Sequence, residues 1–317
     1  MTLAKRPLGR SGIEVAPFAL GGNVFGWTAD KKASFEVLDA FVSAGFNLID
    51  TADVYSTWVP GHRGGESETI LGEWIRESGR RKEVVLATKV GMDMGSGGKG
   101  LSATHIARSV EGSLRRLKTD YIDLYQAHED DPSTPLTETM EAFTHLVDEG
   151  RVRAIGASNY SGARLTEALR TSDEHAWRRF ETVQPRYNLM DRSDFENDLA
   201  ALCRAEGLGV LTYSSLASGF LTGKYRGPDD LGKSPRGARA AARLTERGHR
   251  ILGALDDVAR RTASSPTSVA LAWLIARPGI TAPIASARST DQLKELLLGA
   301  SLNLSASDIT ELDRASA

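Results

Sequence analysis

Short apolar segments alternate with longer amphipathic segments along most of the chain. In the longer segments, hydrophobic residues recur every three or four positions, as at Ile106, Val110 and Leu114, where Ser102 is placed to cap the helix. Near-continuous apolar runs are typical of parallel strands that helices cover. The runs that predict strands are residues 18–20, 46–49, 84–87, 122–125, 152–155, 182–184, 209–211 and 280–284. Eight strands separated by helices predict a (β/α)8 TIM barrel.

Glycine marks the end of several predicted helices, just before the next strand begins. The clearest cases are Gly45, Gly79, Gly150 and Gly207. Because glycine has no Cβ, it adopts the left-handed backbone conformation that ends many helices. The recurrence of this junction supports a repeated strand-and-helix unit.

Two segments lie outside that repeat. Residues 3–15 predict an N-terminal β-hairpin that turns at Gly9–Gly12. Residues 217–250 follow the seventh strand and carry eight Lys and Arg against three Asp and Glu, so we expect a long loop that is a candidate lid. No linker or change of composition divides the chain, and residues 1–317 are predicted to form a single domain.

The composition adds limits on location and partners. Of the 317 residues, 41% are hydrophobic, which excludes disorder as the dominant state. Lys and Arg number 39 against 41 Asp and Glu, and a net charge of −2 argues against nucleic acid or an anionic membrane as the main partner. Cys203 is the only cysteine, and no apolar run approaches the length of a membrane span. We therefore expect a soluble cytoplasmic enzyme.

Ionisable residues stand where the second, third and fourth strands end. Asp50 and Lys89 are 39 residues apart, as are Lys89 and His128, and Tyr55 follows Asp50 closely. Each of these residues alone would be interpreted as a helix cap or a solvated side chain. Because the carboxyl ends of barrel strands meet at one rim, the whole set instead predicts an active site.

At this point the chain resembles the aldo-keto reductase family along nearly its whole length. The matching motifs are Asn47–Tyr55 with Gly65–Glu68, Thr88–Lys89, Tyr125–His128, Gly156–Tyr160, Val183–Asn188 and Tyr213–Leu216. The resemblance implies NADPH-dependent reduction of an aldehyde or ketone to an alcohol. It also implies that the catalytic tetrad consists of Asp50, Tyr55, Lys89 and His128.

The chemistry of carbonyl reduction explains these residue types. An alkoxide forms when hydride reaches the carbonyl, so a proton donor is needed. A phenol is a weak acid at neutral pH, and we expect the Lys89 ammonium to lower the pKa of Tyr55. Asp50 is expected to pair with Lys89, and a neutral His128 to orient the carbonyl oxygen.

The resemblance also assigns residues to the cofactor. Ser158, Asn159 and Gln184 are expected to bind the nicotinamide carboxamide, Tyr213 to stack on its ring, and Ser214, Ser215 and Leu216 to lie along the pyrophosphate. Lys224 is either a phosphate ligand or a solvated loop lysine. The segment expected to hold the adenosine 2′-phosphate contains Ser286, Arg288, Gln292 and Glu295.

Arg288 favours NADPH over NADH, because a guanidinium suits a phosphate in charge and geometry. The chain departs from the family at Leu296, where Asn often follows the glutamate, and this puts the adenine contact in doubt.

The substrate is expected to be a small carbonyl compound. Asn23, Trp27, Trp58 and Met92 lie on loops after the early strands and are candidates to line its site. The alternative for both tryptophans is that they pack under their own loops.

Two other functions remain open. One is a slow-turnover NADP(H)-binding sensor or regulatory subunit of the same fold, as potassium channel subunits are within the family. The other is a Rossmann-type dehydrogenase using Gly95–Gly100, although that glycine pattern does not directly follow a strand. No metal site is expected, because the sequence shows no recognised spacing of metal ligands.

Overall fold

Eight parallel strands form one closed sheet in the computed structural model, which describes residues 4–235 and 237–317. Their order around the barrel is β10-β3-β4-β5-β6-β7-β8-β9. The ring closes where Val210 bridges Ile280 and the Ile284 N–H donates to the Thr212 carbonyl oxygen at 2.8 Å. The predicted (β/α)8 barrel is confirmed. The strands are β3 (Ala19–Gly21), β4 (Leu48–Asp50), β5 (Val85–Val90), β6 (Ile122–Ala127), β7 (Val152–Ser158), β8 (Phe180–Gln184), β9 (Gly209–Val210) and β10 (Ile284–Ala285).

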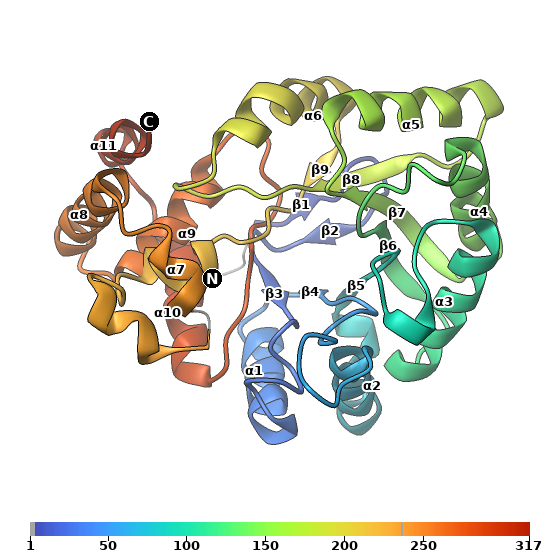
Figure 1. The fold of residues 1–317 in the computed structure, drawn as a ribbon, viewed down its shortest axis with the longest axis horizontal. Helices are drawn as coiled ribbons and strands as arrows, with labels where there is room; N and C mark the ends of the chain where they lie inside the picture. Colours follow the sequence, from blue (N-terminus) through green and yellow to red (C-terminus); the bar gives the residue numbers. More distant parts are fainter. Residues whose placement is uncertain (1–3, 236) are drawn as a thin grey trace.

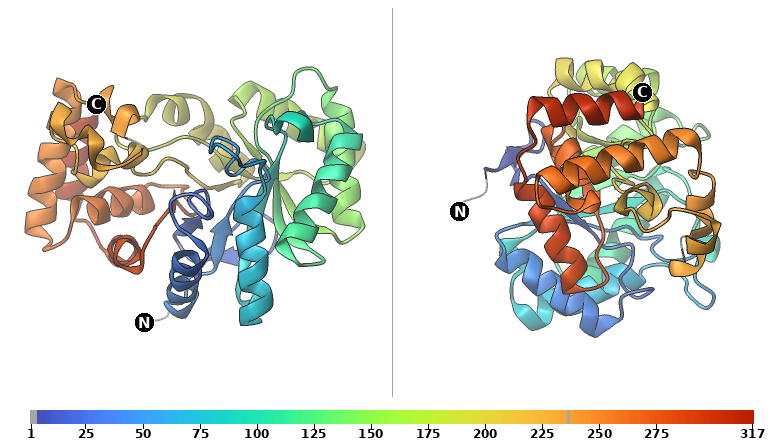
Figure 2. Two further views of the ribbon diagram at one scale, coloured as in Figure 1. Left: turned by 60° about the horizontal axis from the view of Figure 1, so that its bottom comes forward. Right: turned by 90° about the vertical axis from the view of Figure 1, so that its left-hand side faces the viewer.

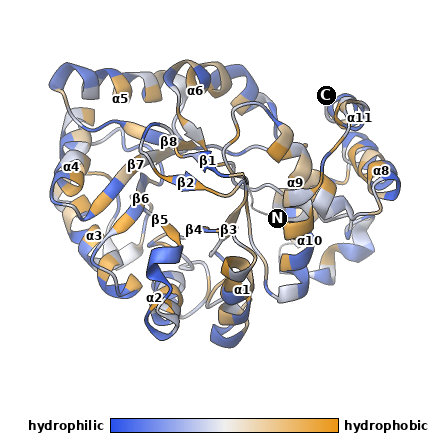
Figure 3. Ribbon diagram, turned by 180° about the vertical axis from the view of Figure 1, so that it is seen from behind, coloured by the Kyte–Doolittle hydropathy of each residue, from blue (hydrophilic) through white to orange (hydrophobic). Residues whose placement is uncertain are grey.

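Helices surround the strands and bury their apolar faces against them (Figure 1). Most helices carry hydrophobic residues on one side and hydrophilic residues on the other (Figure 3), whereas α9 is buried along most of its length. The helix α8 packs beside α11 on the side of the molecule that carries the C-terminus (Figure 2). The helices are α1 (Lys31–Ser43), α2 (Glu66–Ser78), α3 (Ala103–Leu117), α4 (Leu136–Asp148), α5 (Gly162–His175), α6 (Ala200–Glu206), α7 (Gly237–Ala241), α8 (Glu246–Arg261), α9 (Pro266–Ala276), α10 (Thr290–Ser301) and α11 (Ala306–Ser316).

The structure confirms the residues that were predicted to begin and end helices. Ser102 caps α3, since its side chain accepts a hydrogen bond from the His105 N–H. Gly79 and Gly207 end α2 and α6 with φ values of 70° and 62°, in the left-handed region. The sequence therefore identified both kinds of helix boundary correctly.

The N-terminal hairpin closes the end of the barrel where the strands begin. Its antiparallel strands are β1 (Arg6–Pro7) and β2 (Glu14–Val15), as predicted. Leu8, Ile13 and Val15 join the inward-facing strand residues in one buried apolar cluster. The hairpin thereby covers this end of the barrel, and a large cavity opens at the opposite rim, where the strands end.

The last barrel strand begins later than predicted. The apolar run at 280–284 predicts a strand along its length, but β10 is confined to Ile284–Ala285. Thr281 and Ala282 both direct their N–H groups to the Val210 carbonyl oxygen, and Pro283 has no N–H to continue a ladder. The first strand is likewise displaced by one residue, to Ala19–Gly21.

The basic excursion, residues 217–250, was expected to form a long loop but folds into short helices along most of its described length. It contains the short helical segments η4 (Ala217–Thr222) and η5 (Pro228–Lys233), then α7 and the start of α8. Across the part of the chain that the structure describes, no helix has the length and apolar character needed to span a membrane.

Candidate active site

Lys89 lies at the centre of the strand-end cluster and is completely buried. Its ammonium donates to Asp50 Oδ2 at 2.6 Å, to the Thr51 carbonyl oxygen at 2.8 Å and to the Tyr55 hydroxyl oxygen at 3.3 Å. All three ammonium hydrogens are used. Since the ammonium can only donate, it occupies a lone pair of the Tyr55 oxygen and leaves the phenolic hydrogen for another acceptor.

Asp50 is held by two glutamine side chains as well as by Lys89. Its Oδ1 atom accepts from Gln184 Nε2 at 2.9 Å and from Gln126 Nε2 at 3.4 Å. A buried carboxylate with three donors is well compensated for the loss of water. The amide N–H₂ of Gln184, expected to bind nicotinamide, is therefore directed toward Asp50.

Burial opposes the charge on Lys89, but the nearby Asp50 and Tyr55 outweigh it and raise the lysine pKa. Burial also raises the pKa of Tyr55 and exceeds the opposing effect of Lys89. The expected lowering of the Tyr55 pKa is therefore wrong for its net direction, although Lys89 acts in the expected sense. The burial of this phenol depends on tertiary packing, which the sequence motif did not describe.

His128 lines the cavity as a neutral imidazole. Burial, assisted by the charge of Lys89, holds its pKa well below the usual value. Its ring centroid lies 5.8 Å from that of Tyr55, and its buried Nδ1 atom has no hydrogen-bond partner among the described residues. The imidazole and the phenol ring thus lie beside each other, edge to face, on the cavity wall.

A cavity of about 1190 Å³ opens at this rim and extends past the N-terminus of α10. Lys89 is not on the cavity wall but bonds to Asp50 and Tyr55, which are. Every other residue predicted for the site lines that wall: Asn23, Trp27, Asp50, Tyr55, Trp58, Met92, His128, Ser158, Asn159, Gln184, Tyr213, Ser214, Ser215, Leu216, Lys224, Ser286, Arg288, Gln292 and Glu295.

The residues after β7 and β9 form a connected polar edge. The Tyr213 hydroxyl donates to Asn159 Oδ1 at 2.8 Å, and Asn159 Nδ2 donates to the His128 carbonyl oxygen at 2.9 Å. Ser158 Oγ donates to the Gln184 carbonyl oxygen at 3.0 Å. These bonds fix the ring of Tyr213 at the cavity edge, and the ring remains partly exposed.

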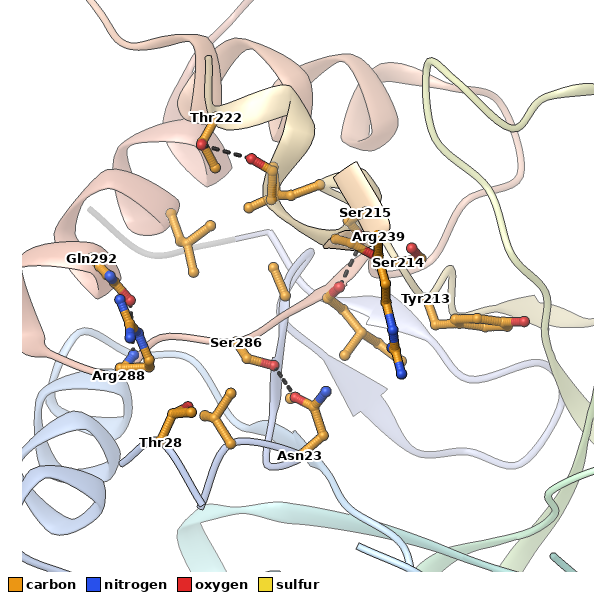
Figure 4. Close-up of a pocket in the computed structure, with 18 of the residues that line it drawn as sticks. Asn23, Thr28, Tyr213, Ser214, Ser215, Thr222, Arg239, Ser286, Arg288 and Gln292 are labelled. Atoms are coloured by element: carbon orange, nitrogen blue, oxygen red, sulfur yellow. Dashed lines mark hydrogen bonds between the residues drawn. The ribbon is translucent and has the colours of Figure 1, made fainter. Parts of the chain in front are cut away.

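The opposite end of the cavity combines a helix N-terminus with unpaired positive charge (Figure 4). Ser289 caps α10, and the Arg288 N–H donates to Gln292 Oε1 at 3.0 Å. No hydrogen bond or ion pair engages the Arg288 guanidinium among the described residues. Between the two ends, Ser286 Oγ donates to Asn23 Oδ1 at 2.5 Å and joins the last and first strands.

Trp27 and Trp58 form an aromatic wall with Tyr55. Their rings meet edge to face at 5.7 Å, and Trp58 contacts Tyr55 at the same centroid distance. Trp58 is 44% exposed, so it does not pack under its own loop. This geometry agrees with the cavity-lining interpretation of both tryptophans.

The glycine-rich loop takes no part in the cavity. Gly95–Gly97 form a short 3₁₀ turn, α3 begins only at Ala103, and no residue of Gly95–Gly100 appears on the cavity wall within the described residues. The loop geometry therefore gives no support to a Rossmann-type site. Throughout residues 4–235 and 237–317, no three His, Cys, Asp or Glu side chains are grouped to hold a metal ion.

Several wall residues escaped the sequence analysis. Arg186 stands two positions beyond Gln184, and the strand-end rule that selected Gln184 extends to it through the two-residue period of a strand. Arg239 and Arg243 belong to the basic excursion, from which only Lys224 was selected. Asp53, inside the Asn47–Tyr55 motif, is not on the cavity wall; it is buried close enough to Glu68 to be affected by that charge, and nothing in its local pattern indicated the burial.

A buried Asp–Lys pair beneath a tyrosine and a neutral histidine, on the rim of a barrel, defines a site suited to carbonyl and alcohol chemistry. The profile of the aldo/keto reductase family matches residues 17–317, and the chain belongs to this family. Membership of this family supports the conclusion that the protein is an oxidoreductase.

Relatives whose names indicate different functions share this similarity. The uncharacterized oxidoreductase YrpG of Bacillus subtilis (strain 168) is 37% identical over 94% of this chain and 91% of its own. The aldo-keto reductase YhdN of the same organism is 34% identical over 93% and 86% of the two chains. A probable voltage-gated potassium channel subunit beta of Oryza sativa subsp. japonica is also 34% identical, over 91% and 88%.

Proposed function

We propose that the protein is a cytoplasmic enzyme that reduces an aldehyde or ketone to an alcohol with NADPH, in a reversible reaction. The observation that carries this proposal is the bonding of Lys89. The ammonium occupies a lone pair of the Tyr55 oxygen at 3.3 Å, and the phenolic hydrogen is left for a substrate oxygen.

Each tetrad residue has a distinct task in this reaction. Tyr55 donates its proton to the carbonyl oxygen, and the Lys89 ammonium stabilises the phenolate that results. Asp50 holds Lys89 in place through the 2.6 Å bond. His128 orients the carbonyl oxygen by hydrogen bonding as a neutral imidazole. NADPH supplies the hydride when bound.

The residues of the cavity fit a phosphorylated dinucleotide. A helix N-terminus and the unpaired Arg288 guanidinium suit the 2′-phosphate, and Lys224 comes from the adjoining basic segment. The partly exposed ring of Tyr213 offers a surface on which the nicotinamide stacks. Ser158, Asn159 and Gln184 would contact its carboxamide, while Ser214, Ser215 and Leu216 would follow the pyrophosphate.

The direct test is a panel of aldehydes and ketones with the purified wild-type protein. Consumption of NADPH is followed by its absorbance, and the alcohol is quantified by chromatography. We expect one molecule of alcohol for each NADPH consumed. Turnover of no carbonyl compound, in either reaction direction, would contradict the proposal.

Arg288→Gln is expected to weaken the use of NADPH much more than the use of NADH. Because the lost guanidinium would contact only the 2′-phosphate, the KM for NADPH should rise about tenfold to hundredfold while that for NADH changes little. Steady-state kinetics with both cofactors measure this difference. Arg115→Gln, on the exposed face of α3, serves as the charge-matched control. An equal loss with both cofactors would instead place Arg288 away from the 2′-phosphate.

A second candidate is a slow-turnover NADP(H)-binding sensor, favoured by relatives named as potassium channel beta subunits. Single-turnover kinetics distinguish it from an enzyme. A sensor would transfer hydride once and then release NADP⁺ far more slowly than the hydride step. An enzyme would release NADP⁺ fast enough to sustain repeated turnover.

A further inference from the structure

The cavity wall carries more positive charge than the cofactor assignments use. Arg243 is already paired with Asp191 at 3.0 Å, and the proposed function assigns Lys224 and Arg288 to phosphates. Arg186 and Arg239 remain, and both side chains are exposed. Neither has a hydrogen bond or ion pair among the described residues.

The two remaining arginines have different origins. Arg239 lies on α7, within the same basic segment as Lys224, and extends that group of cations. Arg186 instead follows β8 directly and is bridged to Tyr213 in the manner of a parallel strand pair. A side chain mounted on the barrel itself is better fixed in position than one on a long excursion.

Arg186 stands at the nicotinamide end of the cavity. Side chains alternate along an extended strand, so Arg186 shares the face of Gln184 and lies one step nearer the rim. Its guanidinium carbon is 5.8 Å from the centroid of the Tyr213 ring. The phosphates would lie in the other direction, toward Arg288 on the far side of the Ser286–Asn23 hydrogen bond.

Among the residues that the structure describes, no carboxylate forms an ion pair or hydrogen bond with this guanidinium. Asp191 is near enough for the charge of Arg186 to favour its ionised form. Its carboxylate, however, already accepts from Arg243 Nη2 at 3.0 Å and from Asn188 Nδ2 at 2.9 Å. Arg186 therefore faces the cavity with its donors available.

The barrel order places Arg186 across the mouth from the proton donor. Four steps around the sheet lead from β4 to β8, and in a ring of eight strands this is the opposite side. Tyr55 and Trp58 follow β4, so a substrate with its carbonyl at Tyr55 directs its far end toward Arg186. The aromatic wall of Trp27 and Trp58 flanks the intervening space.

We infer that the preferred substrates are carbonyl compounds with a carboxylate or another anionic group at the end remote from the carbonyl, and that Arg186 binds this group. The inference rests on the proposed carbonyl reduction and names its substrate class. An arginine fork can bind a carboxylate through two parallel hydrogen bonds, which sets the orientation of the substrate as well as its charge.

Three aldehydes of similar shape test this inference with wild-type protein and NADPH. They are 4-formylbenzoate, its neutral methyl ester and the cationic 4-(trimethylammonio)benzaldehyde. We expect kcat/KM to fall in that order, with the carboxylate favoured over the ester by about tenfold to hundredfold. Arg186→Glu should reverse the order of the two charged substrates, and Arg186→Lys should keep the wild-type order.

A control variant and a binding measurement show which part of the site changes. Arg115→Gln controls for a change of net charge and should keep the wild-type order. NADPH titrations, followed by nicotinamide fluorescence, separate the substrate from the cofactor phosphates. Weaker NADPH binding by Arg186→Glu, with the substrate order retained, would assign Arg186 to the cofactor and overturn the inference. Turnover without charge preference in wild type would overturn the inference alone, and absence of all turnover would overturn the proposed function with it.

Discussion

Replacing Tyr55 by phenylalanine should lower kcat for carbonyl reduction about 10²- to 10⁴-fold, the usual contribution of a positioned proton donor. The substitution removes one hydroxyl group from the cavity wall and keeps the ring that packs against Trp58 and His128. Lys89 keeps two of its three acceptors, Asp50 and the Thr51 carbonyl oxygen. We therefore expect normal folding and a nearly unchanged affinity for NADPH.

The measurement is single-turnover reduction of a carbonyl compound at saturating NADPH, together with an NADPH binding titration. Tyr121→Phe removes a phenolic hydroxyl outside the cavity and is the matched control. Hydride transfer by Tyr55→Phe at the wild-type rate would show that another group supplies the proton. Loss of NADPH binding in the same variant would indicate a structural effect instead.

The barrel was predictable because its signal repeats. Each apolar run was short and followed an amphipathic segment, so an error at one strand did not change the number of strands. The exact ends were less predictable. β10 begins after Pro283 because the proline has no N–H for the ladder, and the apolar pattern that includes Ile280 does not reveal this.

The candidate site was predictable as a set of residues and less so as an electrostatic environment. Strand-end positions and family motifs selected side chains that the structure brings to one cavity. The predicted lowering of the Tyr55 pKa was wrong because burial, which depends on tertiary packing, raises this pKa more than Lys89 lowers it. Arg186 lies inside the Val183–Asn188 motif but was assigned no role, because only Gln184 of that motif is expected to contact the cofactor.

Asp53 is a second residue whose electrostatic environment the sequence did not reveal. We expect it to make the stability of the protein depend on pH. Asp53 is 1% exposed, and neither carboxyl oxygen forms a hydrogen bond of good geometry among the described residues, although the Val54 N–H lies close enough to oppose the rise in its pKa. Burial, with a smaller contribution from the charge of Glu68, raises its pKa to about 8. Glu68 is itself held by Thr88 Oγ1 and Arg116 Nε, both at 2.6 Å.

The direction of the pH effect follows from the raised pKa. Between the unfolded pKa near ~4 and the folded pKa of about 8, the folded chain keeps the Asp53 proton and the unfolded chain releases it. Folding then takes up a proton, so the contribution of Asp53 to the free energy of unfolding falls by up to about 1.4 kcal/mol for each pH unit in this interval. Above the folded pKa this loss is complete.

Asp53→Asn should therefore stabilise the protein at neutral and mildly alkaline pH by an amount on the order of 2 kcal/mol or more, and the advantage should disappear near pH ~4. The amide resembles the neutral carboxyl in shape but has no proton to lose. Urea unfolding of variant and wild type across this pH interval measures the difference in unfolding free energy. Asp173→Asn, at an exposed position on α5, controls for the loss of a carboxylate. A constant difference between Asp53→Asn and wild type at all pH values would mean that Asp53 is ionised in the folded protein, because only a proton retained on folding makes the difference grow as pH rises.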